Sequence, residues 1–201
     1  ALAVYTAFLY RTTRNIASDS RKTARLARKE FKAAHRPWIS VKSMTATTPL
    51  SIDEGGAQVT IQFVLQNVGK SPAVNVTVSA EMCAEVVSDF GVERQKAICE
   101  RERANAPEIG PFGHTLFPGQ IFAVSSRVMV TPEDMERLTT RFFGPAIVGC
   151  VSYKFTFAKG HHQTGFISTL RRRCPKNAEK LFIKQDGDVP VSALVLTPSY
   201  V

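Results

Sequence analysis

The sequence predicts a mainly β protein, an antiparallel β-sandwich of about seven strands with two short helical insertions and a long N-terminal helix before it. The first observation is that apolar and polar residues alternate over residues 59–65 and again over residues 74–80. A period of two with one polar face is typical of an antiparallel strand that lies on a core. The second observation is that residues 12–34 contain no Pro or Gly and are rich in Ala, Arg and Lys, which favours a helix.

Charge divides the chain near residue 36. Residues 1–10 carry no charged side chain, whereas residues 11–36 carry nine Lys or Arg and two acidic residues. Residues 37–201 carry 17 basic and 15 acidic residues, so the formal net charge of +9 belongs mainly to an N-terminal arm. We therefore expect two domains, residues 1–36 and residues 37–201.

The first ten residues, ALAVYTAFLY, are apolar, but a helix that spans a bilayer needs about 20 such residues. We interpret them as a membrane-anchor stub, the end of a span that begins upstream. Tyr5, Phe8 and Tyr10 would contact lipid at the interface, and Arg11 and Arg14 follow at once. A signal-peptide remnant and a short helix packed on the body are the alternatives.

The helix expected after the stub is basic and has a weak apolar face. Its apolar positions at helical spacing are mostly alanine, so they would bury little surface. The helix should therefore stand out from the body or lie along a partner or along anionic lipid headgroups, with Arg21, Arg25 and Arg28 as further contacts. A solvated basic helix without a ligand is the alternative. Pro37 should end it, because the residue before a proline is disfavoured in the α region.

A turn separates the two alternating runs. Asn67, Gly69 and Pro72 form it, since glycine can take a positive φ and proline fixes its own φ and lacks a ladder donor. The second run should place Val74 on the core side, together with Val76, Val78 and Ala80. Residues 83–106 have mixed charge and are expected to form a partly helical insertion.

The other elements are expected along the chain as follows: a first strand at Trp38–Lys42, a loop over residues 45–57, a long connection over 107–119, a strand at 120–130, a helix from Thr131 to about Phe142, a strand at 147–157 with Phe157 inward, a hairpin through Gly160 into 162–170, a polar segment over 171–188 and a last strand near 191–196.

Four cysteines, at positions 83, 99, 150 and 174, lack the spacing of a zinc site. The even count permits two disulfides, and Cys83 with Cys99 could close one loop. We favour four reduced thiols, because four cysteines in 201 residues are not a disulfide-dense composition.

The common fingerprints of nucleotide-binding proteins, hydrolases and zinc proteases are absent from the sequence. The adjacent pair His161 and His162 would need metal ligands from elsewhere. A second basic cluster, Arg171–Arg173, lacks the interleaved aromatic residues that stack on bases, so nucleic acid is disfavoured. We expect no catalytic, cofactor-binding or metal-binding residue, no cofactor, and no enzymatic activity.

The segment N-V-G-K-S-P-A at Asn67–Ala73, followed by Asn75–Val78, resembles a pattern of bacterial Ig-like modules of the CARDB type. The layout also resembles uncharacterised proteobacterial membrane-anchored proteins, in which a span and a basic helix lead through a step such as Arg36-Pro37-Trp38 into a β-sandwich. The resemblance covers most of residues 36–170. It implies an Ig-like fold that mediates interactions and carries no catalytic residues.

Together these observations predict a non-catalytic, membrane-anchored interaction or accessory subunit of a larger membrane complex. Its partners would be membrane lipids, through the N-terminal segment, and one or more proteins. We expect the bacterial inner membrane with a single N-terminal span, and the positive-inside rule places the body in the cytoplasm. A periplasmic body, which would favour disulfides, is the alternative location. A soluble ligand- or carbohydrate-binding module and an enzyme with an unrecognised site are the other functions considered.

Overall fold

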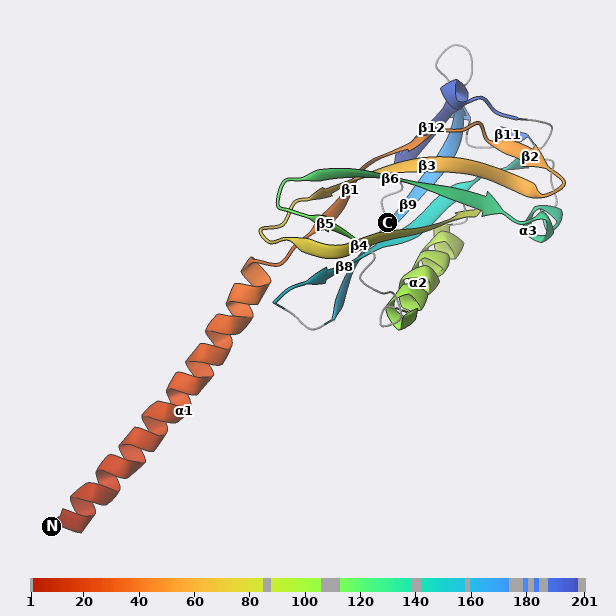
Figure 1. Cartoon of the computed structure of the whole chain (residues 1–201). Helices are drawn as coiled ribbons and strands as arrows, with labels where there is room; N and C mark the ends of the chain where they lie inside the picture. Colours follow the sequence, from red (N-terminus) through yellow and green to blue (C-terminus); the bar gives the residue numbers. More distant parts are fainter. Residues whose placement is uncertain are drawn as a thin grey trace. The chain divides into compact units, whose positions relative to one another are not determined.

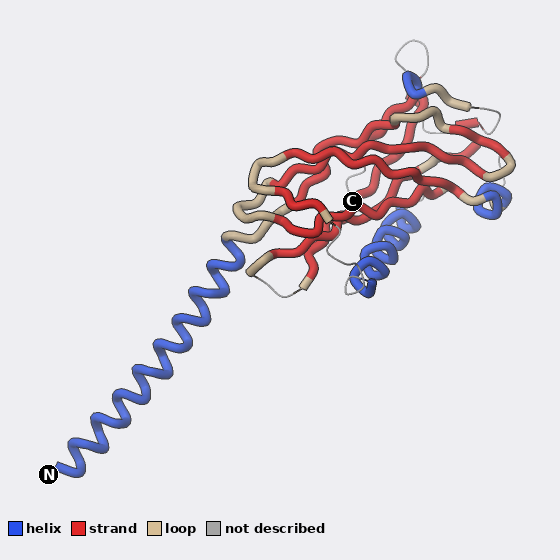
Figure 2. Tube along the Cα trace, in the orientation of Figure 1, coloured by secondary structure: helices blue, strands red, loops and turns tan. Residues whose placement is uncertain are grey.

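The computed structural model describes residues 2–84, 88–105, 113–138, 142–157, 160–173, 179–180, 183–184 and 188–198. The chain divides into two compact units, residues 1–36 and residues 37–201. The first unit holds one long helix, and the second is mainly β with two antiparallel sheets (Figures 1 and 2). The mainly β prediction and the long N-terminal helix are confirmed.

Helix α1 (Leu2–Ala34) includes the uncharged start of the chain, so it begins ten residues before the helix expected from residue 12. It ends where the sequence predicted, just before Pro37. The backbone N–H of His35 donates to the Phe31 carbonyl at 3.0 Å, and the two rings stack with centroids 4.4 Å apart. This last turn closes the helix before the proline, which cannot continue it.

The first sheet is built around β3 (Gly56–Asn67). Its neighbours β1 (Ile39–Ala46), β2 (Ser51–Asp53) and β6 (Ile121–Val130) all pair with β3 in antiparallel register. The predicted alternation of β3 is confirmed, because Val59, Ile61, Phe63 and Leu65 are all buried.

The prediction of a loop over residues 45–57 is wrong, because β1 extends into this segment and β2 forms a hairpin with β3. The Gly55 N–H donates to the Asp53 carboxylate at 2.8 Å in the turn of this hairpin. Gly56 has φ of 103°, and a Cβ there would clash with the Val130 carbonyl oxygen. Glycine is therefore required where the hairpin passes β6.

The second sheet has the strand order β9, β8, β4, β5, and the short strands β10 and β12 also pair with β9. These strands are β4 (Ala73–Cys83), β5 (His114–Leu116), β8 (Ala146–Phe155), β9 (His161–Arg173), β10 (Glu179–Lys180) and β12 (Leu194–Pro198). A separate pair joins β7 (Phe142–Phe143) to β11 (Ile183–Lys184). The described strands exceed the seven expected, because the polar segments that we took as connections contribute short strands of their own.

The two sheets share one core. The rings of Phe63 on β3 and Phe166 on β9 lie 5.3 Å apart, and Ile61, Ile147 and Val151 are fully buried in the same cluster. Side chains of the two inner faces thus interdigitate, as they do between packed β-sheets.

The prediction of which residues face the core is wrong at the start of β4. Ala73 and Val76 are buried, whereas Val74 is not part of the core. Between them Asn75 has φ of 54°, and the pairing of β4 with both of its neighbours shifts register there. Asparagine tolerates the left-handed region, so it accommodates a bulge that reverses which residues face inward.

Two helices accompany the sheets. Helix α2 (Ser88–Asn105) confirms a helical insertion. Helix α3 (Pro132–Glu136) begins as predicted, with the Thr131 hydroxyl accepting from the Asp134 N–H at 3.3 Å. It ends earlier than predicted, since Phe142–Phe143 is a strand that pairs with β11.

Two further expectations near the end of the chain are wrong. Phe157 lies beyond the end of β8 in a turn and is 56% exposed. The residues expected to open the last strand form a short 3-10 turn instead, at Val191–Ala193, so β12 begins only at Leu194.

Candidate interaction surfaces

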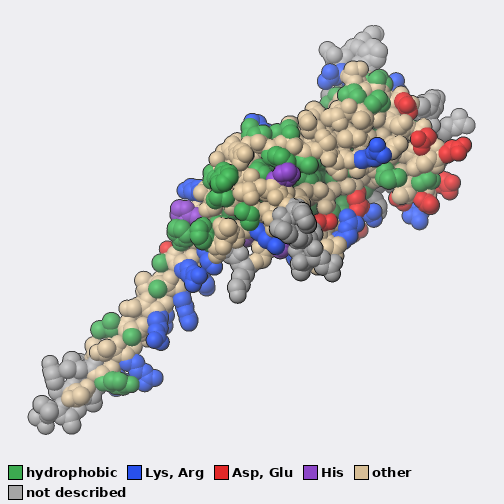
Figure 3. All heavy atoms as spheres, in the orientation of Figure 1, with side chains coloured by type: hydrophobic (Ala, Val, Ile, Leu, Met, Phe, Trp, Pro, Cys, Tyr) green, Lys and Arg blue, Asp and Glu red, His purple; other side chains and the backbone are tan. Residues whose placement is uncertain are grey.

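Helix α1 carries all of its Lys and Arg residues on one side. At 3.6 residues per turn these eight residues fall within an arc of about 120°. The arc, called the basic face below, consists of Arg11, Arg14, Arg21, Lys22, Arg25, Arg28, Lys29 and Lys32. The two acidic residues of the helix, Asp19 and Glu30, lie outside it. Figure 3 shows the Lys and Arg side chains gathered along one side of α1.

The positive charge of the basic face is hardly compensated within the helix. Among the residues that the structure describes, one α1 cation, Lys22, has an acidic partner, Asp19, with Nζ and Oδ1 3.4 Å apart. Both side chains are more than 70% exposed, and such surface pairs contribute less than about 1 kcal/mol. The face therefore presents a net positive charge.

The five arginines predicted as contacts all belong to the basic face, while Tyr10 is 70% exposed beside it. The side chains of Tyr5 and Phe8 lie outside the described residues. Sequence reasoning missed that Lys22, Lys29 and Lys32 share the face with the arginines. The signal was present as a spacing of three or four residues between the cations. Within the described part of the chain, no helix is both long and apolar enough to cross a membrane.

Asn67, the first residue of the turn between β3 and β4, is fully buried. Its Nδ2 donates to the carbonyls of Ser71 and Leu116 at 2.8 and 2.9 Å. Its Oδ1 accepts from the N–H groups of Gly69 at 3.0 Å and Trp38 at 3.4 Å. The side-chain amide thus joins three segments of the body, and Pro72 leads directly into β4. These bonds describe a structural role for the turn.

A groove of about 710 Å³ lies between β1 and the strands β9 and β12. Its lining comprises Trp38–Met44, Val68, Gln95, Gln163–Ser168, Leu196 and Pro198. Trp38 is 48% exposed, and Lys42 is the charged residue of this lining. The groove could not be predicted from local sequence patterns, because its walls are more than 100 residues apart in the chain. It is a mainly apolar concave surface with polar groups from Ser, Thr and Gln, as in many ligand sites.

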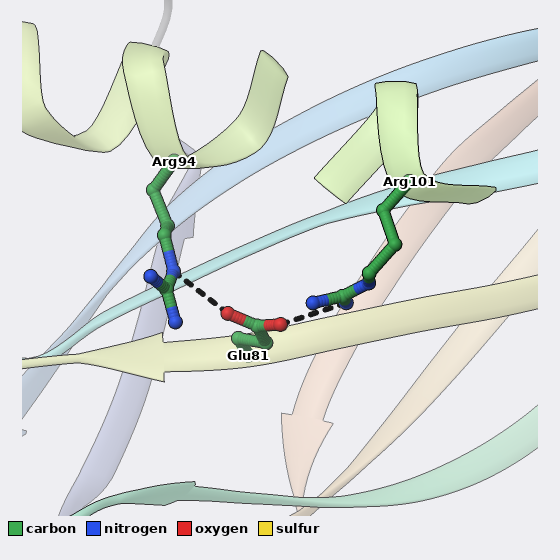
Figure 4. Close-up of polar contacts among 3 residues, drawn as sticks. All are labelled: Glu81, Arg94 and Arg101. Carbon is green, nitrogen blue, oxygen red and sulfur yellow. Dashed lines mark hydrogen bonds and ion pairs between the residues drawn. The ribbon is translucent and has the colours of Figure 1, made fainter. Parts of the chain in front are cut away.

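Helix α2 is fixed to the second sheet by charged and polar side chains (Figure 4). The Glu81 carboxylate of β4 accepts from Arg94 Nε at 2.7 Å, and its other oxygen lies 2.7 Å from Arg101 Nη2. Burial acts to raise the pKa of Glu81, but the attraction of the two guanidinium groups outweighs burial and leaves the pKa below its usual value. The charges of Glu81, Arg94 and Arg101 therefore have a structural role.

Polar contacts with β9 complete the docking of α2. Gln163 Nε2 donates to the Cys99 carbonyl at 2.8 Å, and Arg103 donates to Gln163 Oε1 at 3.0 Å. Gly165 on β9 lies directly under the end of the Gln95 side chain, which would have to move if a Cβ were added there.

Three of the four cysteines are described, and all three are free thiols. The prediction of reduced cysteines is confirmed for Cys83, Cys99 and Cys150, and a disulfide between Cys83 and Cys99 is wrong. Burial raises the pKa of Cys83 to about 11. Burial and the neighbouring Cys99 thiol also raise the pKa of Cys150. Such thiols are poor nucleophiles at neutral pH. Cys174 lies outside the described residues.

The arginine cluster and the histidine pair singled out in the sequence do not come together in one site. Arg171–Arg173 belongs to β9 and not to the polar segment expected there; successive strand side chains point to opposite faces, so the three arginines do not form one patch. His162 stacks on Tyr153 with ring centroids 5.8 Å apart. Among the described residues, no group of three His, Cys, Asp or Glu could hold a metal ion.

Comparison of the chain with protein-family models, curated proteins and solved structures found no match.

Proposed function

We propose that this chain is a non-catalytic, membrane-associated interaction or accessory subunit of a larger bacterial membrane complex. The observation that carries the proposal is the basic face of α1, eight cations on one side of a helix whose first nine residues carry no charge. Uncharged residues followed by Arg and Lys are typical of a segment at the cytoplasmic surface of a membrane. The near-neutral body would then bind the protein partner.

An Ig-like fold and a position at the inner membrane with a cytoplasmic body are parts of the same proposal. The N-V-G-K-S-P-A turn and the two packed antiparallel sheets support the Ig-like assignment. The three free thiols favour the cytoplasm over the periplasm, where disulfides persist.

The test is purification of the full-length protein from its native membrane in mild detergent, with co-purifying subunits identified by mass. We expect stoichiometric partners in the membrane fraction. Trp38→Ala should reduce recovery of the partner, because Trp38 lines the groove. Phe117→Ala removes a comparably exposed aromatic residue outside the groove and serves as the matched control. Recovery of the protein alone from the soluble fraction would contradict the proposal.

The groove also favours a second function, a soluble ligand- or carbohydrate-binding module. A half-exposed Trp38 beside Ser, Thr and Gln side chains offers a flat apolar ring and hydrogen-bonding groups to a sugar. Titration of the full-length protein with a panel of soluble glycans should then give saturable binding that Trp38→Ala abolishes and Phe117→Ala preserves. Absence of saturable binding would remove this candidate.

A further inference from the structure

We propose that α1 lies flat on the surface of an anionic lipid bilayer, with the basic face toward the headgroups. This inference rests on the proposed membrane association and specifies its geometry. The feature to be explained is the one-sided distribution of charge. Between Tyr10 and Ala34, Lys and Arg occupy about a third of the circumference and are absent from the rest.

The length of the basic face indicates a partner surface parallel to the helix. From Arg11 to Lys32 the helix rises about 32 Å, at 1.5 Å per residue. Electrostatic attraction to a charged surface is screened within about 8–10 Å at physiological salt. If α1 stood perpendicular to the membrane, only the cations nearest the surface, such as Arg11 and Arg14, would be attracted to it. A flat helix brings all eight within reach.

The remaining circumference is uncharged apart from Asp19 and Glu30 and holds few large apolar side chains. Ile16, Leu26 and Phe31 are 61%, 59% and 51% exposed, and most of the other positions are Ala, Thr and Ser. An acidic partner helix would instead need a continuous apolar seam for packing. The pattern fits a planar charged surface, on which each cation contributes separately.

Lipid, in preference to nucleic acid, is indicated by the part of α1 that precedes the cations. Residues 2–10 belong to the same helix and contain no charged residue, while Tyr10 is 70% exposed at the junction. A bilayer interface accepts apolar and aromatic groups beside headgroup contacts, whereas a phosphate backbone offers nothing to an apolar end.

The test uses the full chain and vesicles of equal parts phosphatidylglycerol and phosphatidylcholine, with pure phosphatidylcholine vesicles for comparison. In the exchange variant, three arginines trade places with their preceding neighbours: Thr13→Arg with Arg14→Thr, Ser20→Arg with Arg21→Ser, and Ala27→Arg with Arg28→Ala. Composition, length and net charge stay the same, but three charges move to the opposite side of the helix. The control variant, Arg14→Lys, Arg21→Lys and Arg28→Lys, keeps the face intact.

Co-sedimentation should show that the wild type and the Lys variant bind anionic vesicles with affinities within about twofold of each other. The exchange variant should bind about 100-fold more weakly, since each basic residue near an anionic membrane contributes about a factor of five. Far-ultraviolet circular dichroism checks that all three chains contain the same amount of helix. Binding should fall with added salt and be absent from phosphatidylcholine.

Equal binding of the exchange variant and the wild type would overturn the flat geometry. Tighter binding to duplex DNA than to anionic vesicles would overturn lipid as the partner. If the exchange variant fails to differ on vesicles while native purification still recovers the membrane complex, only the geometry is wrong. If the wild type binds no vesicle and leaves the membrane fraction, the inference and the proposed function both fail.

Discussion

The two long helices of this protein both carry many charged residues, but the charges are balanced on α2 and mostly positive on α1. Helix α2 carries four acidic and four basic residues, and α1 carries two acidic and eight basic residues. On α2, Arg94 and Arg101 bind the carboxylate of Glu81 in the sheet. Ile98, on the same helix, packs against β8 and is 1% exposed. On α1, Leu26 is 59% exposed, and one of eight cations has an acidic partner among the described residues. Balanced charge accompanies a helix that belongs to the fold, and one-sided charge accompanies a helix that presents a surface.

The largest expected difference between the helices concerns their apolar side chains. Ile98→Ala should lower the free energy of unfolding by about 2–5 kcal/mol, because it leaves a cavity between α2 and β8. Leu26→Ala on α1 removes a side chain of the same size from an exposed position and should change stability by less than about 0.5 kcal/mol. Urea denaturation of both variants makes the comparison, and equal losses would show that the two helices do not differ in this way.

A thiol buried near α2 should react more slowly with an alkylating reagent than a thiol exposed on α1. Because the pKa of Cys83 lies near 11, its alkylation at about pH 8 should be about 100-fold slower in the folded protein than in urea. An exposed reference thiol introduced by Ala27→Cys on α1 should react at about the same rate in both conditions. Peptide mass spectrometry measures each site, and fast labelling of folded Cys83 would mean that α2 does not protect it.

The ion pairs under α2 should have a smaller effect. Glu81→Gln removes both guanidinium partners of a half-buried carboxylate and should destabilise the protein by about 1 kcal/mol. Asp19→Asn removes the exposed pair on α1 and should change stability by no more than about 0.3 kcal/mol. The two variants are measured by the same denaturation assay, in which an effect of Asp19→Asn as large as that of Glu81→Gln would be contrary to the comparison.

The smallest effect is the pH dependence of the same ion pairs. The pKa of Glu81 in the folded protein lies below its ordinary value of 4.5, so the stabilisation is present above pH 4.5 and is lost as the pH falls through the lowered pKa. The stability difference between wild type and Glu81→Gln should therefore shrink as the pH is lowered below 4.5. A difference that grew at acid pH would contradict a lowered pKa of Glu81.

Local pattern predicted those parts of the fold that depend on local chemistry. Alternation identified β3, Thr131 identified the start of α3, and Pro37 the end of α1. The errors arose where contacts between residues far apart in the sequence determine the local structure. The bulge at Asn75 sets the phase of β4, and pairing with β11 makes Phe142–Phe143 a strand. The groove needs β1 on one side and β9 with β12 on the other, which no local pattern indicates. The basic face, by contrast, depends only on helical spacing and was fully present in the sequence.

Hydrogen–deuterium exchange of the full chain, with and without anionic vesicles, tests most directly whether α1 is the surface-binding helix. Without vesicles, amides of α2 should exchange slowly and those of α1 quickly, because few buried contacts hold α1. Vesicles of phosphatidylglycerol and phosphatidylcholine should slow exchange along α1 from Arg11 to Lys32 and leave α2 unchanged. If vesicles leave the exchange rates of α1 unchanged but slow exchange in the body, α1 is not the surface-binding helix.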